Sequence, residues 1–137
     1  MASILKVDTL TGVTTAGSIS VTGEGNSTTT NLQQGLNKGF VAFNGTGTIA
    51  VDDSFNLSSL SDIGTGEYDA NWTNVMGTSK YMMSGMKSHS VSDTSCNLKI
   101  SSPSSNFTAS SVRVRSIENA TVADSDYVSM MCHGDLA

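Results

Sequence analysis

The stretch of residues 39–73 constrains the fold of this chain more than any other part of its sequence. Two mainly apolar runs, at 40–43 and 48–51, flank Asn-Gly-Thr-Gly, and a second Gly-Thr-Gly at 64–66 precedes a segment in which apolar and polar residues alternate. Alternation with a period of two, broken by glycine-rich turns, is typical of antiparallel strands. The stretch therefore predicts four short strands in two hairpins.

The turns of these hairpins carry predictions of their own. Because glycine tolerates a positive φ, the repeated Gly-Thr-Gly predicts related geometry at the two turns. The adjacent carboxylates Asp52 and Asp53 are expected to end the second strand. The aromatic residues Tyr68 and Trp72 share one face of the fourth strand, and we expect both in the core.

The remainder of the chain after residue 39 continues the same pattern. Segments suited to strands lie at residues 80–89, 96–100, 111–118 and 127–133. With those of the hairpins they make about eight strands, which predicts an all-β fold, an antiparallel β-sandwich or jelly-roll-like domain over 39–137. Phe107 stands alone in a serine-rich loop. It either packs on the domain or is exposed as a surface-contact residue.

Residues 1–38 are expected to form a separate, extended arm, because residues 1–36 contain no aromatic side chain and too little apolar mass to fold alone. A first strand is predicted from four apolar residues and a second around Val21, with a polar linker at 26–30. The four residues are Ile4, Leu5, Val7 and Leu10. The arm either stays flexible in isolation or orders against a partner by adding strands to an exposed edge. The clean alternation of 6–10 favours the second alternative.

A short neck is predicted at residues 31–38, where one or two helical turns would follow an N-cap at Asn31 or Thr30. Leu32 and Leu36 are four residues apart and so share a helix face. Three copies of the chain could pack these leucines around a threefold axis. A plain linker turn is the alternative, since Gly35 lowers helix propensity by about 1 kcal/mol.

Composition excludes several classes of function. Ser and Thr supply 39 of 137 residues and charged residues only 14%, which favours strands over helices. The net charge of −5 argues against nucleic-acid binding. Arg113 and Arg115 make at most a small positive spot or a solvated strand face. The sequence contains neither a run of about 20 apolar residues nor a signal-peptide pattern, so we expect no membrane insertion and folding in a cytoplasm.

The sequence offers no convincing catalytic, metal or cofactor site. His89 and His133 lack metal-ligand spacing, and Cys96 and Cys132 are expected to be reduced thiols, although a pair on adjacent strands remains an alternative. Glycoside hydrolysis needs two carboxylates near each other. Glu67 and Asp69 share a strand face, and nothing else in the sequence supports that role.

One segment resembles a known family. The sequence FNGTGTIAVDDSFNLSSLSDIGTGEYDANWT is similar to a segment of tail-fibre and minor tail proteins of marine and freshwater bacteriophages, including cyanophages, and the N-terminal SILKVDTL resembles the usual start of those proteins. The two matches cover about a third of the chain. The resemblance implies a structural protein of the virion, assembled in the host cytoplasm, trimeric, and anchored to the particle by its N-terminus.

Three functional hypotheses follow. A tail-fibre-like protein would attach by the arm and present its β-domain to a glycan or protein of the host surface. A capsid decoration protein would use the same arm to clamp capsid subunits, and the short chain without a shaft favours it. A small hydrolase acting on surface glycans has the least support.

Overall fold

The computed structural model describes residues 4–12, 19–23, 28–88, 96–101 and 106–136. The chain divides into two compact units, Met1–Leu36 and Asn37–Ala137. The division falls two residues before the expected boundary.

Among its described residues, the Met1–Leu36 unit contains one small hairpin and one helical turn. Strands β1 (Ser20–Thr22) and β2 (Thr29–Asn31) pair antiparallel, with Val21 opposite Thr30. Helix α1 (Leu32–Gly35) follows directly, and the Leu32 amide donates to the Ile19 carbonyl at 2.9 Å. The expected strand around Val21 is present. Part of the expected polar linker is strand β2, and residues 4–12 form no strand in the single chain.

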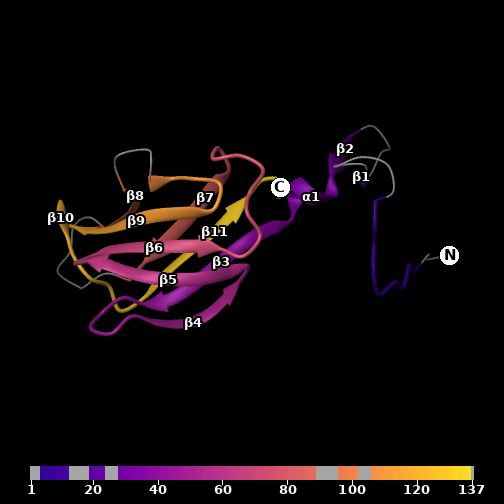
Figure 1. Ribbon diagram of the computed structural model, residues 1–137. Helices are drawn as coiled ribbons and strands as arrows, with labels where there is room; N and C mark the ends of the chain where they lie inside the picture. Colours follow the sequence, from indigo (N-terminus) through magenta and orange to yellow (C-terminus); the bar gives the residue numbers. More distant parts are fainter. Residues whose placement is uncertain (1–3, 13–18, 24–27, 89–95, 102–105, 137) are drawn as a thin grey trace. The chain divides into compact units, whose positions relative to one another are not determined.

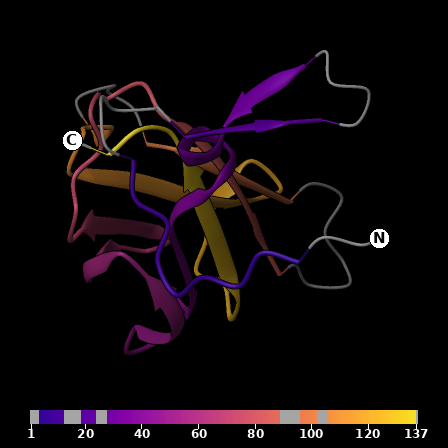
Figure 2. The same cartoon turned by 90° about the vertical axis from the view of Figure 1, so that its right-hand side faces the viewer.

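The Asn37–Ala137 unit is an antiparallel β-sandwich (Figures 1 and 2), as the sequence predicted. One layer, here called the β3 sheet, has the order β4-β3-β11-β7. The other, the β9 sheet, has the order β10-β9-β6-β5, with β8 also paired to β9. The bounds of these strands are β3 Asn37–Asn44, β4 Ala50–Phe55, β5 Leu57–Gly64, β6 Glu67–Trp72, β7 Met82–Lys87, β8 Cys96–Ile100, β9 Ser111–Glu118, β10 Thr121–Val122 and β11 Val128–His133.

The two predicted hairpins are confirmed, but they belong to different sheets. β3 pairs β4 in one layer and β5 pairs β6 in the other. The chain changes sheet at Asn56, which has a φ of +60°. Its side-chain amide donates to the carbonyls of Lys38 and Asn74, and these bonds hold the corner.

The expectation that Asp52 and Asp53 end the second strand is wrong. β4 continues through both residues to Phe55, with a register shift that leaves Asp52 without a partner on β3. All six residues of this edge strand are exposed, so their carboxylates stay in water and cost the strand little.

The core lies between the two sheets and is built from alternating positions of their strands. Phe43 and Tyr68 are fully buried and pack edge to face, with ring centroids 4.9 Å apart. Trp72 is buried as well, and its indole N–H donates to the Tyr81 hydroxyl at 3.0 Å. The predicted core positions of Tyr68 and Trp72 are confirmed. The other apolar residues of the core are Val41, Ala70, Met76, Val112, Val114, Val128, Met130 and Cys132.

The two Gly-Thr-Gly turns share geometry at their last glycine, because Gly47 and Gly66 both have a φ of +64°. Their amides are already bonded within the protein. Gly45 donates to the Ser125 carbonyl at 2.9 Å, and Gly66 donates to the Asp124 carboxylate at 2.6 Å. Both turns are thereby held to one segment before β11. The motif therefore stabilises one end of the sandwich.

Candidate functional site

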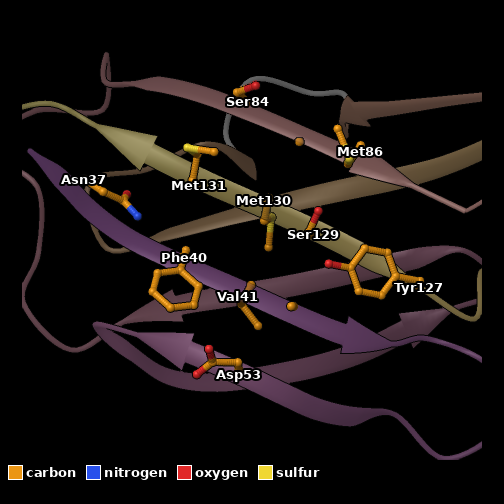
Figure 3. Close-up of a pocket in the computed structure, with 12 residues that line it drawn as sticks. Asn37, Phe40, Val41, Asp53, Ser84, Met86, Tyr127, Ser129, Met130 and Met131 are labelled. Carbon is orange, nitrogen blue, oxygen red and sulfur yellow. The ribbon is translucent and has the colours of Figure 1, made fainter.

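The outer face of the β3 sheet carries a groove of about 420 Å³ (Figure 3). Its walls come from all four strands of the sheet and from Tyr127, which precedes β11. The residues that line it are Asn37, Phe40, Val41, Ala42, Asp53, Ser84, Gly85, Met86, Tyr127, Ser129, Met130 and Met131.

Strand register explains why these side chains come together. One row across the sheet contains Phe55, Phe40, Met131 and Ser84, each opposite the next on a neighbouring strand. The next row on the same face contains Asp53, Ala42, Ser129 and Met86. Small residues in the middle of the second row leave a depression between larger neighbours, and that depression is the groove.

Large apolar side chains remain in water on this face. Met86 is 67% exposed and Phe55, at the rim, 54%. The Phe40 and Phe55 rings stack with centroids 6.4 Å apart. Tyr127 and Met131 are each about half exposed, at 45%. Because a single domain gains nothing from apolar side chains in water, a clustered set of them is typical of a contact surface.

The outer face of the β9 sheet has a different chemistry. Arg113 bonds the Asp69 carboxylate at 2.8 Å, and Arg115 bonds Glu67. Of the two alternatives for the arginines, the positive spot is therefore neutralised by neighbours on β6, and the partly solvated strand face agrees with the structure. Glu67 and Asp69, the two carboxylates of the hydrolase hypothesis, are therefore each in an ion pair with an arginine. Such pairs across neighbouring strands stabilise the face of a sheet.

The predicted contact residues take different positions. Ile4 and Leu5 are 78% and 80% exposed, and Val7 and Leu10 are also exposed. Phe107 packs on the domain, half-buried, with its ring centroid 4.5 Å from that of Tyr81. Its packing agrees with the first of the two alternatives for this residue, and a contact through its exposed part stays a prediction.

The predicted neck forms a single helical turn. Leu32 lies on α1 and is half-buried, whereas Leu36 follows the helix and is more than half exposed. The trimer contact of these leucines stays a prediction.

Cys132 is a free, buried thiol whose pKa is raised to about 11 by burial. His89 lies outside the described residues. Within the described part of the chain no three His, Cys, Asp or Glu side chains gather into a possible metal site. Across the same ranges, no helix has the length and hydrophobicity needed to cross a membrane.

Comparison with known proteins adds no relative: neither family models, nor curated proteins, nor solved structures give a match.

The groove could not be predicted from the sequence. Its residues are spread from position 37 to position 131, and the signal that could have found them is the set of methionines at alternating strand positions, such as 82, 86 and 131. Of the three methionines at 82–86, Met82 and Met86 are exposed, whereas Met83 packs against the core.

Proposed function

We propose that this chain is a structural protein of a bacteriophage virion, similar to a tail fibre. It attaches to the particle by its N-terminal arm and presents the β-sandwich for recognition of the host surface. The observation that carries this proposal is the exposure of Ile4 and Leu5, which are 78% and 80% accessible in a unit separate from the sandwich. An isolated chain gains nothing by keeping such side chains in water, whereas burial against a partner gains about 25 cal/mol per Å².

Each part of the chain has a role in this proposal. Ile4, Leu5, Val7 and Leu10 bind another virion protein, by adding a strand to it or filling its pockets. Leu32 and Leu36 hold three copies together as a homotrimer. The groove on the β3 sheet contacts the host surface, and Phe107 is a secondary contact.

The test is the copy number of the chain in purified particles, measured by quantitative mass spectrometry against the major capsid protein. A few copies per particle are expected of a tail protein. Hundreds of copies would instead support a capsid decoration protein, which the absence of a shaft between arm and domain favours. A chain missing from the particle would refute both roles.

A pair of variants tests the arm itself. Particles assembled with Leu5→Asp should lose the chain, because a buried carboxylate without a partner is costly. Val75→Asp is the matched control, since Val75 is an exposed apolar residue of the sandwich unit. Particles that keep both variants would contradict attachment through the arm.

A further inference from the structure

We propose that the groove on the β3 sheet binds a protein segment that carries a lysine or arginine next to apolar side chains, such as a surface loop of a host protein. This inference rests on the proposed function, and it selects protein over glycan as the ligand of the groove.

The apolar part of the groove suits aliphatic side chains. Phe40, Met86, Met131 and the ring of Tyr127 are large apolar groups of its lining. Figure 3 shows these side chains around Ser129, one of the small residues at the bottom of the groove. Methionine is flexible and polarisable, so a methionine-lined surface adapts to branched apolar side chains of varied shape. Phe40, Met86 and Met131 offer no strong hydrogen-bond partner to a sugar ring, which presents a hydroxyl at most positions.

The charge of the groove selects the polar part of the ligand. Asp53 is the one charged residue among the twelve that line the groove, and it is exposed. One of its oxygens, Oδ1, accepts the Ser54 amide at 2.8 Å. Among the described residues, the carboxylates that form ion pairs are those of Glu67, Asp69 and Glu118, so Asp53 is not part of an ion pair there.

A cation is therefore the complementary group for this site. The rings of Phe40, Phe55 and Tyr127 reinforce that choice, because aromatic faces attract lysine and arginine side chains. A second copy docked groove to groove would instead offer Asp53 no cation, because the lining contains none, and would join two chains whose net charge is −5 each. Charge complementarity thus favours a foreign basic segment over self-association.

The experiment uses the full chain with ¹³C-labelled methionine methyl groups. The probe is the peptide acetyl-Ser-Leu-Lys-Leu-Ser-amide, and the same peptide with glutamine in place of lysine is its control. We expect the lysine peptide to shift the methyl signals of Met86 and Met131 and to leave that of Met76, which is fully buried in the core, unchanged. The glutamine peptide should bind about fivefold more weakly, as an exposed ion pair allows.

Two matched pairs of variants locate the site. Asp53→Asn should weaken the lysine peptide about fivefold, whereas Asp52→Asn, at the adjacent carboxylate outside the groove lining, should not. Met86→Gln should weaken both peptides, whereas Met82→Gln should not. Met82 is as exposed as Met86 on the same strand and does not line the groove. All four positions are exposed, so the variants should fold.

Several outcomes would overturn the proposal. These are equal affinity for the two peptides, no loss of affinity in Asp53→Asn, or the same methyl shifts with a trimer of N-acetylglucosamine. Shifts that grow with protein concentration alone would assign the groove to a second copy. The test is separate from that of the proposed function, because the peptide can bind a chain that is absent from particles, and a chain counted in particles can fail to bind the peptide.

Discussion

Replacement of Gly45 by alanine tests the packing of the Gly-Thr-Gly turn directly. A Cβ at this position would lie 2.2 Å from the Tyr68 hydroxyl oxygen, 2.5 Å from Cζ and 2.8 Å from Cε1. Tyr68 is fully buried and packs edge-on against Phe43, so its ring cannot turn into solvent. The backbone of the turn or the tyrosine has to move by about an ångström.

The free-energy cost follows from the contacts that such a movement breaks. Overpacking of a core typically costs about 1–3 kcal/mol. The Tyr68 hydroxyl also donates to the Gly45 carbonyl at 3.3 Å and accepts the Ser125 amide at 3.4 Å, long bonds that together add about 1 kcal/mol. We therefore expect Gly45→Ala to lower the free energy of unfolding by about 2–4 kcal/mol, a large part of the ~5–15 kcal/mol typical of a domain.

Urea denaturation followed by tryptophan fluorescence measures this loss, because Trp72 is the single tryptophan of the chain and is buried. The midpoint should fall by about 1–2 M. Gly47→Ala is the control. Gly47 has a φ of +64°, and a Cβ added there would meet open space, so the substitution should lower the free energy of unfolding only by the ~1 kcal/mol typical of a left-handed residue with a side chain. If the free energy of unfolding of the Gly45→Ala protein lies less than 1 kcal/mol below that of the wild type, the packing argument is refuted.

Three further predictions concern the core. Trp72→Ala should lower the free energy of unfolding by about 3–5 kcal/mol, because it empties a core position and leaves the Tyr81 hydroxyl without its indole donor. Far-UV circular dichroism should then show a largely unfolded domain at 37 °C. A folded variant would contradict the core position of Trp72. Burial raises the pKa of Tyr68 and of Tyr81 to about 12. Tyrosines of the unfolded chain ionise near pH 10, so the free energy of unfolding should be constant with respect to these groups below that pH. Between pH 10 and 12 it should fall by about 1.4 kcal/mol per pH unit for each tyrosine. Constant urea midpoints across this range would contradict the burial of the two hydroxyls. The Cys132 thiol, with its raised pKa, should react with iodoacetamide at pH 8 only after denaturation, as peptide mass spectrometry can measure, and rapid labelling of the native chain would show that it is accessible.

Strands with local signals were predictable from the sequence. The segments 96–100 and 111–118 match β8 and β9, because alternation within a strand depends only on which residues are near in sequence. The continuation of the second strand through Asp52 and Asp53 was missed, because β4 is an exposed edge, where charged residues cost little.

Pairing between distant strands was not predictable. Shared faces were evident for Glu67 with Asp69 and for Arg113 with Arg115, but their ion pairs depend on β6 lying beside β9, more than 40 residues later in the chain. The groove depends in the same way on β11 lying between β3 and β7. Residue types alone do not reveal such neighbours, since strand order is a property of the whole fold.

The position of β3 has a mechanical consequence. β3 begins at Asn37, directly after the N-terminal unit, and is an inner strand bonded to β4 on one side and β11 on the other. The hydrogen bonds of antiparallel strands run perpendicular to the chain, so tension applied through the N-terminal unit loads both ladders in shear, many bonds at once. A ligand held in the groove would pull on the same sheet. Force would then pass from the N-terminal unit to the groove within a single sheet, without separating the two sheets of the sandwich.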